Sequence, residues 1–367
     1  MVSGWARDSM SSSSWILRPW LRLLNKPKAN VSPVLSLPHR LVMIFSLAID
    51  VSGSRVVAGG LPRSQVPESV LCFDGRTGRP IRSSPINTSD AVWYWICPDG
   101  RLLSLGVDGS IRLWNMEEGG RADLPPALNR EPTSAATLSP EGILLRCPDA
   151  TGPLELWDLV SGELLNRIEI GEPARWLVVG PGARRIVAGT SEGMLVLDGM
   201  EGRVVSRIPK GPDVRLSLCR VPVDVTPDGR KIVSAGMNGT LDIWNAETGQ
   251  KTLTVSAHPG ETSPHLDRWK KEAADDRARG RNVDVHSMAL PAGVNALAIT
   301  PCGRAVASGG EDGRIGIWDV TTGEDLGSLP GHARSVNAVA FTRDGTRLVS
   351  AGNDPFIRVW KNPLGPP

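Results

Sequence analysis

Five tryptophans close short β-like runs at repeating intervals, and this repeat constrains the fold of the 367-residue chain more than any other feature. The runs SIRLW, PLELW, TLDIW, RIGIW and FIRVW end at Trp114, Trp157, Trp244, Trp318 and Trp360, which lie 43, 87, 74 and 42 residues apart. A period of about forty residues indicates an array of small units, each of which needs its neighbours to bury its apolar faces.

Turn residues divide each unit into short strands. Between Val294 and His332, the apolar runs VNALAI, RAVASG, RIGIW and DLGSL are separated by Gly-containing turns, which predicts a four-stranded β-meander. The interval of 87 spans two units, with Leu197 in place of one tryptophan, and counting back from Trp114 reaches Phe73. The sequence therefore predicts seven units, which begin near Leu41, Ala91, Thr133, Arg175, Arg220, Val294 and Val336.

These units resemble the WD-repeat family of β-propellers. The Trp-Asp pair stands at Trp157-Asp158 and Trp318-Asp319, and a clear Gly-His pair precedes the last unit at Gly331-His332. Trp114 and Trp244 are followed by Asn, and Trp360 by Lys, so the pattern is eroded. The resemblance implies an all-β fold, a seven-bladed propeller of four-stranded antiparallel blades.

The last unit supplies only three strands, because the chain then continues as Asn-Pro-Leu-Gly-Pro-Pro. Residues 33–37 resemble the stretch before the last unit, so we expect an N-terminal strand to complete the last blade and close the ring. The expected organisation is a poorly ordered tail over residues 1–30, the propeller over 31–363 with a charged insert at about 259–290, and a short C-terminal tail over 364–367.

Composition narrows the functional class. The net charge of +2 gives no reason to expect nucleic acid. The five cysteines form no Cys-x-x-Cys pair, so we expect neither a metal site nor a disulfide framework, and a cytoplasmic location fits best. Residues 41–49 are too short to span a bilayer, although they resemble a signal-peptide core, which leaves secretion as the alternative location. We expect no cofactor, no stable membrane insertion and a monomer.

His332, Ser350 and Asp354 fall in one unit and suggest a catalytic triad. The resemblance implies a structural role instead, because WD-repeat blades join these residue types to the third-strand tryptophan, here Trp360, in a hydrogen-bonded chain. Tryptophan has only an N–H donor and needs a buried acceptor such as a serine hydroxyl. The histidines near the insert, His258, His265 and His286, have irregular spacing and are interpreted as solvated loop residues rather than zinc ligands.

The resemblance places partner binding on the face that carries the loops before the first strands and between the second and third strands. Trp93-Tyr94-Trp95 is an aromatic cluster in an aromatic-poor chain; alternation sends one of the three into the core, and the others are candidate hot-spot residues. In the insert, Trp269 is a candidate apolar contact beside lysines and arginines that would attract an acidic partner. The candidate partner-binding residues are Asn295, Asn337, Glu311, Asn353, Met237, Arg175, Trp93, Tyr94 and Trp269.

The sequence thus predicts a non-enzymatic scaffold that binds a protein or peptide on one propeller face. One alternative is an enzyme or small-ligand site in the central channel, for which Asp50 and Asp224 are the main candidate residues. The other is a regulatory or sensor propeller that belongs to a signalling system. The partner itself is not encoded in the repeat, because a fold is separable from what its loops bind.

Overall fold

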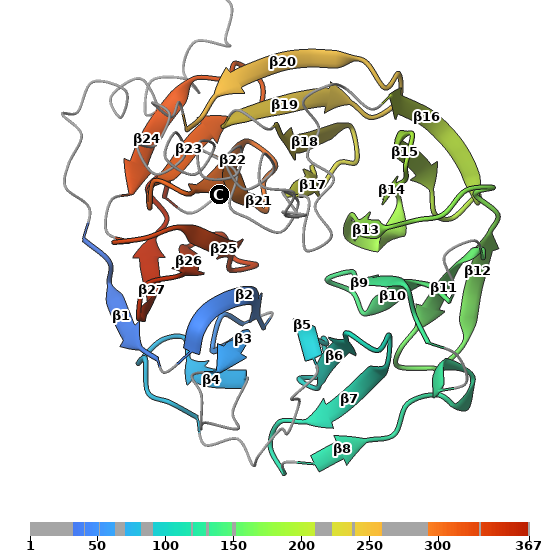
Figure 1. The fold of residues 1–367 in the computed structure, drawn as a ribbon, viewed down its shortest axis with the longest axis horizontal. Coiled ribbons are helices and arrows are strands. Elements are labelled where there is room, and N and C mark those ends of the chain that lie inside the picture. The colour runs from blue at the N-terminus through green and yellow to red at the C-terminus, as the bar shows by residue number, and fades with distance from the viewer. Residues whose placement is uncertain are drawn as a thin grey trace, which may run out of the picture.

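Seven small antiparallel sheets form a closed ring around a central channel in the computed structural model (Figure 1). The structure describes residues 32–39, 41–50, 52–62, 70–81, 91–118, 120–129, 132–148, 152–209, 222–236, 239–258, 293–329 and 332–365. The predicted seven-bladed propeller is confirmed, and blades two to six each follow the chain from an inner first strand to an outer fourth strand.

The strands of blades one to four have the following bounds. Blade one contains β2 (Leu41–Ile49), β3 (Arg55–Pro62) and β4 (Val70–Asp74); blade two contains β5 (Ala91–Ile96), β6 (Leu102–Gly106), β7 (Ile111–Asn115) and β8 (Gly120–Ala122); blade three contains β9 (Ala135–Leu138), β10 (Ile143–Cys147), β11 (Leu154–Asp158) and β12 (Leu164–Ile168); blade four contains β13 (Trp176–Val179), β14 (Ile186–Gly189), β15 (Gly193–Asp198) and β16 (Arg203–Pro209). Two short 3-10 helices, η2 (Pro126–Asn129) and η3 (Pro181–Ala183), lie in connections.

The remaining blades have the following bounds. Blade five contains β17 (Val223–Val225), β18 (Lys231–Ala235), β19 (Thr240–Asn245) and β20 (Lys251–Ser256); blade six contains β21 (Val294–Ile299), β22 (Ala305–Gly310), β23 (Ile315–Asp319) and β24 (Asp325–Leu329); blade seven contains β25 (Val336–Phe341), β26 (Arg347–Gly352), β27 (Phe356–Lys361) and, on its outer side, β1 (Leu35–Pro38).

The N-terminal strand closes the ring as predicted. β1 pairs antiparallel with β27, from Leu35 opposite Val359 to Pro38 opposite Phe356. Blade one departs from the regular pattern, because the described residues beyond β4 contribute an isolated bridge between Phe73 and Pro80 rather than a full fourth strand.

The core is divided among the seams between blades. Seven clusters of buried apolar residues occur in the described chain, and each draws its members from two adjacent blades. Strand alternation explains this, since successive side chains of a strand point toward the blade before it and the blade after it. Each blade is therefore stable only with both neighbours in place.

The Asp or Asn that follows the tryptophan in blades two, three, five and six caps a turn, which explains the Trp-Asp and Trp-Asn pairs. Asp158 Oδ1 accepts hydrogen bonds from the backbone N–H groups of Val160 (2.7 Å) and Ser161 (3.0 Å). Asn245 Oδ1 does the same in blade five, at 2.9 and 3.0 Å. The glycine that ends such a turn, for example Gly162, has a positive φ (+74°) that other residues rarely adopt.

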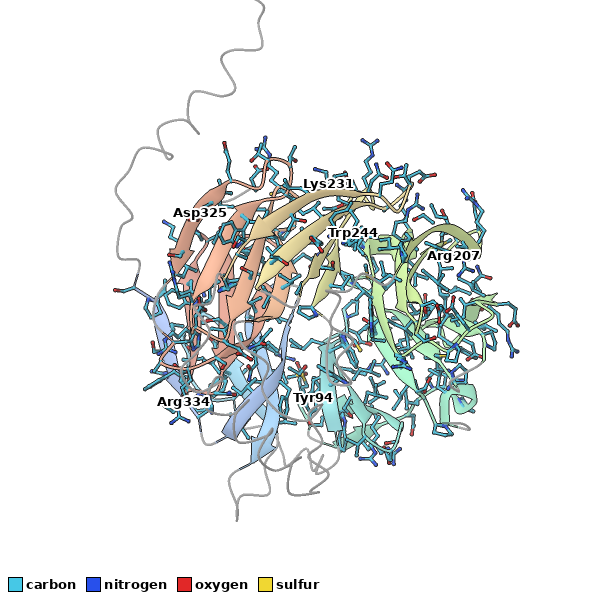
Figure 2. The ribbon with its side chains drawn as sticks, turned by 45° about the horizontal axis from the view of Figure 1, so that its top comes forward. Tyr94, Arg207, Lys231, Trp244, Asp325 and Arg334 are labelled. Atoms are coloured by element: carbon cyan, nitrogen blue, oxygen red, sulfur yellow. The ribbon has the colours of Figure 1, made fainter. Side chains whose placement is uncertain are left out.

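A basic residue at the start of the second strand ties several blades to the next one. Arg55 bonds Glu117 (2.9 Å) and Arg185 bonds Glu247 (2.9 Å). Arg101 and Lys231, the latter labelled in Figure 2, reach backbone oxygens of the following blade. Arg347 donates to the Gly75 carbonyl oxygen (2.7 Å), so this series of contacts also crosses the seam where the ring closes.

Replacing Arg347 with alanine is expected to lower the free energy of unfolding by about 1–2 kcal/mol, because the variant loses a charged hydrogen bond across the closing seam. Thermal and urea unfolding measure the change. Arg76→Ala is the matched control, since Arg76 is exposed on the same side of the ring and its side chain makes no described contact. Equal stability of the two variants would contradict a role for Arg347 in closure.

Candidate interaction surface

The two faces of the ring carry different kinds of connection. The turns between first and second strands and between third and fourth strands lie on one face, which we name the turn face. The connections before each first strand and between second and third strands lie on the other, which we name the docking face; it includes Val107, Arg175, Asn295, Glu311, Arg334 and Asn353.

β-Bulges deliver two of the predicted residues to the docking face. The pairing register of β21 with β22 shifts between Val294 and Ala296, and that of β25 with β26 shifts between Val336 and Ala338. Asn295 and Asn337 are thus the extra residues of two equivalent bulges. A bulge leaves one residue outside the ladder and redirects its side chain, which is why bulges recur beside functional sites.

The predicted polar residues differ in how far they are already engaged. Asn337 Nδ2 donates to Asn353 Oδ1 (2.7 Å) and to the Ile44 carbonyl oxygen of blade one (3.3 Å), so this pair bridges two blades. The Arg175 side chain is exposed and Asn295 is half-buried, and neither side chain has a hydrogen bond or ion pair within the described chain. Arg175 and Asn295 are therefore the polar groups of the predicted set that are free to bind a partner.

The assignment of Tyr94 to the partner-binding set is wrong. Tyr94, labelled in Figure 2, is 2% exposed, and its ring lies against Gly59 of β3, where a Cβ atom would come within 2.0 Å of Cε2. Its backbone N–H also donates to Ser46 Oγ (3.2 Å). Tyr94 is thus the member of the aromatic cluster that packs in the core, while Trp93 and Trp95 line the central channel.

Two predicted partner-binding residues, Met237 and Trp269, lie outside the described residues, as does most of the insert. Glu311, also predicted, is half-buried at the turn between β22 and β23, and its backbone N–H donates to the Gly293 carbonyl oxygen (3.1 Å).

Blade seven holds a buried polar chain of the residues that resemble a catalytic triad. Trp360 Nε1 donates to Ser350 Oγ (2.8 Å), Ser350 Oγ lies 2.7 Å from His332 Nε2, and His332 Nδ1 lies 2.9 Å from Asp354 Oδ1. Since tryptophan only donates and carboxylate only accepts, Trp360 donates to Ser350, Ser350 donates to neutral His332, and His332 donates to Asp354. The side chains of His332 and Asp354 are 0% and 1% exposed, so solvent and substrate have no access to this group.

Arg358 completes this polar chain, although the repeat pattern did not single it out. Its Nη1 donates to Asp354 Oδ2 at 2.5 Å. Burial acts to raise the pKa of Asp354, but the hydrogen bonds and charges of His332 and Arg358 outweigh burial and hold that pKa well below its usual range. The signal was a basic residue two positions before Trp360 on a buried strand.

The interpretation of His258 as a solvated loop residue is wrong. His258 is 3% exposed, its Nδ1 lies 3.0 Å from Asp312 Oδ1, and its Nε2 lies 2.9 Å from Ser308 Oγ, which also accepts from Trp318 Nε1 (2.9 Å). Blade six therefore has the same Trp, Ser, His and Asp chain as blade seven, with Gly316 in the place of Arg358. His265 and His286 lie outside the described residues.

Blade three replaces this chain with an ion pair. Arg146 stands where blades two, five, six and seven have serine, and its Nε donates to Glu155 Oε2 (2.9 Å), which also accepts from Trp157 Nε1 (3.0 Å). The recurring need is a buried acceptor for the tryptophan N–H, supplied by serine in blades two, five, six and seven. The buried hydrogen bond of the tryptophan N–H thus has a structural role in every blade that has it.

The central channel contains a cavity of about 780 Å³ lined by the first strands of all seven blades. The two carboxylates considered there for chemistry are engaged in structural bonds. Asp224 accepts from the backbone N–H groups of Val225 (2.8 Å) and Ile299 (2.8 Å), and Asp50 accepts from Ser52, Ser54 and the Arg55 N–H. Among the described residues, no three His, Cys, Asp or Glu side chains are placed to hold a metal ion.

The chain matches one family model and is similar to several known proteins. The family model described as "WD domain, G-beta repeat" matches residues 283–319 and 323–361. The chain is 28% identical to autophagy-related protein 16 of Arabidopsis thaliana over 123 residues (30% of this chain, 24% of that protein). It is 26% identical to telomerase protein component 1 of Rattus norvegicus over 263 residues (64% and 10%) and 20% identical to striatin-3 of Mus musculus over 272 residues (69% and 34%).

The closed ring of seven antiparallel sheets defines a β-propeller. The match of the family model to residues 283–319 and 323–361, together with the similarity to the relatives above, supports a WD-repeat β-propeller protein. The chain spans between a tenth and about a third of the length of the three relatives compared above. Within the described residues, no helix is long and apolar enough to cross a membrane.

Proposed function

We propose that the protein is a non-enzymatic scaffold that binds a protein or peptide on its docking face. The free polar groups of the docking face carry this proposal, one of them, Asn295, at a β-bulge. On the docking face, Arg175 and Asn295 present polar groups that no described residue engages, and Val107 on the same face is 76% exposed.

Further observations support a scaffold in a reducing compartment such as the cytoplasm. The polar chains that resemble active sites are buried, and Asp50 and Asp224 in the channel are bonded to backbone. Burial raises the pKa of Cys72 to about 11 and that of Cys97 to about 12, so both thiols stay protonated and unreactive at neutral pH. Telomerase protein component 1 is, by its name, part of a larger assembly.

Replacing both Arg175 and Asn295 with alanine is expected to weaken partner binding at least tenfold, because central interface residues often contribute more than about 1 kcal/mol each. The full-length protein is used to capture partners from native lysate, and each captured partner is then titrated calorimetrically with the purified variants. Thermal unfolding should be unchanged, since neither side chain has a described contact.

The matched control is Arg76→Ala with Arg184→Ala, which removes two exposed side chains from the turn face. This control should bind the partner as the unmodified protein does. The scaffold proposal fails if no specific partner is retained, and the docking-face assignment fails if the control weakens binding as much as the Arg175 and Asn295 replacements do.

A further inference from the structure

Two tryptophans of blade two, which we name the aromatic wall, border the central channel. Trp93 and Trp95 of β5 both line the cavity of about 780 Å³, and both are half-buried. On one side they pack against the apolar cluster between blades two and three, which includes Leu105 and Leu138. The rest of each indole ring faces the channel. A cavity of this volume lies within the range of ligand sites, whose walls are largely apolar and aromatic.

Blades six and seven show that the fold does not require large residues at these positions. The first strands can be aligned by the serine that accepts from the blade's tryptophan, because Tyr94 pairs with Ser104 in blade two. The residues paired with the corresponding serines are Leu297 in blade six and Val339 in blade seven. The residues equivalent to Trp93 and Trp95 are therefore Ala296, Ala298, Ala338 and Ala340. Alanine suffices for packing there, so the indole rings of blade two exceed what the fold needs.

Charge differs between the two ends of the cavity. Of the charged residues in its described lining, Asp50, Glu141 and Arg343 lie at the turn-face end. Asp224 lies within β17 and accepts from two backbone N–H groups. Arg175, directly before β13, is the one charged residue of that lining at the docking-face end, and its side chain has no hydrogen bond or ion pair within the described chain. A carboxylate that approaches from the docking face therefore meets an unpaired cation.

The free cation and the aromatic wall border the same opening. First strands run from the docking face to the turn face, so Arg175, directly before β13, and Trp93, directly after the bulge of β5, both lie near the docking face. Blade three stands between them and contributes small residues, Ser134 and Ala136, to the cavity lining. Trp95 lies further along β5, deeper in the channel. A ligand that pairs with Arg175 can therefore extend an apolar group toward both tryptophans.

We propose that the partner binds through an acidic peptide segment that carries a large apolar side chain. Its carboxylate pairs with Arg175, and its apolar side chain enters the channel against the aromatic wall. This inference rests on the proposed scaffold function and names the chemistry of the partner. A single guanidinium matches the two oxygens of a carboxylate, whereas phosphate groups are typically recognised by clusters of arginines. Tryptophan and arginine are also the residue types that most often dominate binding energy at an interface.

Selection from a phage-displayed library of short random peptides on the full-length protein tests this chemistry. We expect the enriched peptides to combine Asp or Glu with a large apolar residue. The strongest peptide is then synthesised and titrated calorimetrically. Arg175→Glu should bind it at least tenfold more weakly, and should prefer the same peptide with lysine in place of its acidic residues.

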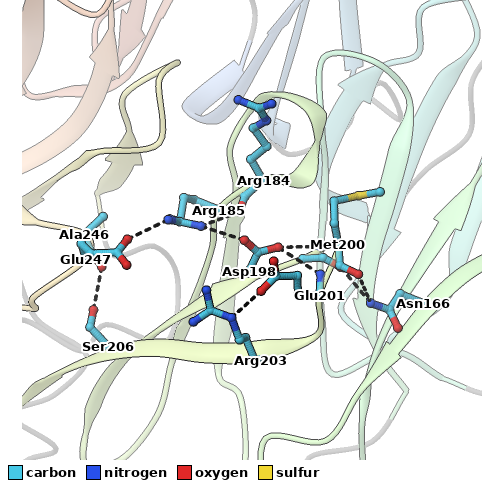
Figure 3. A network of polar contacts seen from close by, with 11 residues as sticks. Asn166, Arg184, Arg185, Asp198, Met200, Glu201, Arg203, Ser206, Ala246 and Glu247 are labelled. Atoms are coloured by element: carbon cyan, nitrogen blue, oxygen red, sulfur yellow. Dashed lines mark hydrogen bonds and ion pairs between the residues drawn. The ribbon is translucent and has the colours of Figure 1, made fainter.

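Arg184→Glu is the matched control for the charge reversal. Arg184 belongs to the same blade and is exposed on the turn face, where its side chain extends away from the ion pairs of Arg185 with Asp198 and Glu247 (Figure 3). This variant should bind the selected peptide as the unmodified protein does.

Two further variants test the aromatic wall separately from the charge. Trp95→Ala introduces the residue that blades six and seven have at this position. Ala340→Phe leaves both tryptophans in place and narrows the cavity from blade seven, where Ala340 is half-buried in the lining. Each variant should bind the selected peptide at least tenfold more weakly. Thermal unfolding of both variants checks that the ring remains folded.

The inference is overturned if selection enriches no peptide, or only basic or wholly polar ones. It is also overturned if Arg175→Glu, or both channel variants, bind the selected peptide as tightly as the unmodified protein. A partner captured from lysate through a basic or wholly polar segment would contradict this inference and leave the scaffold proposal intact. Failure to capture any specific partner would instead count against the scaffold proposal itself.

Discussion

Deletion of residues 31–40 is expected to abolish the cooperative unfolding transition of the protein. This segment contains β1, the strand that completes blade seven. Leu37 is 4% exposed and packs in the apolar cluster between blades seven and one. The deletion also removes the hydrogen bonds from the Val34 N–H to the Val359 carbonyl oxygen (2.7 Å) and from the His39 N–H to the Pro355 carbonyl oxygen (3.1 Å).

The loss of stability is large because every blade of a closed ring packs against both of its neighbours. Burial of one leucine contributes about 1.5–3 kcal/mol, and β1 contributes in addition its pairing with the outer edge of β27. A β1 side chain also reaches blade one, since a Cβ atom at Gly78 would lie 2.5 Å from Leu37 Cδ2. Total stabilities of about 5–15 kcal/mol leave little reserve for a ring that opens at this point.

Circular dichroism and calorimetry during heating measure the transition. Deletion of residues 1–30, which keeps β1, is the matched control and should melt as the full chain does. A second construction starts the chain at residue 41 and appends residues 32–39 after residue 365 through a short linker. Because β1 runs antiparallel to β27, this order makes an ordinary hairpin and should recover cooperative melting. Unchanged melting after the deletion would show that β1 is dispensable.

The closed ring could be predicted from sequence because the same strand and turn residues recur in several units. Each tryptophan, each capping Asp or Asn and each turn glycine recurs at a fixed place, so an eroded unit such as the one with Leu197 is recognised from its neighbours. The interblade contacts of Arg55, Arg185 and Arg347 were equally available, since a basic residue recurs at the start of several second strands.

The candidate site was harder to predict, for three physical reasons. His258 was misassigned because Ala257 replaces the glycine before it and the insert separates it from the first strand of its blade. Tyr94 was misassigned because alternation says that one aromatic residue of three is buried without saying which, and Gly59 on another strand decides it. The exposed leucines Leu164 and Leu165 could not be told from core leucines by pattern, because only burial separates the two kinds.

Replacement of Asp354 with asparagine is expected to lower the free energy of unfolding by about 3–5 kcal/mol, because it leaves the buried Arg358 without its counter-charge. Asp354 accepts from His332, from Arg358 and from the Ala333 backbone N–H (3.2 Å). Urea unfolding at neutral pH measures the change. Asp312→Asn in blade six is the comparison: the Asp312 side chain is 39% exposed and Gly316 occupies the place of Arg358, so about 1 kcal/mol is expected there.

The cost of the Asp354 replacement should depend on Arg358 and on pH. Adding Arg358→Met removes the cation that Asp354→Asn leaves without a counter-charge, so the double variant should be more stable than Asp354→Asn alone.

The pKa of Asp354 lies below its ordinary value of 3.8 in the folded state, so the unfolded chain binds more protons in acid. The stability from this carboxylate is therefore complete above about pH 4 and is lost as pH falls toward the folded-state pKa. The gap between the unmodified protein and Asp354→Asn should narrow below pH 4 and stay constant above it. A gap that widens in acid, or a double variant less stable than Asp354→Asn, would show that the Asp354 and Arg358 charges do not stabilise blade seven together.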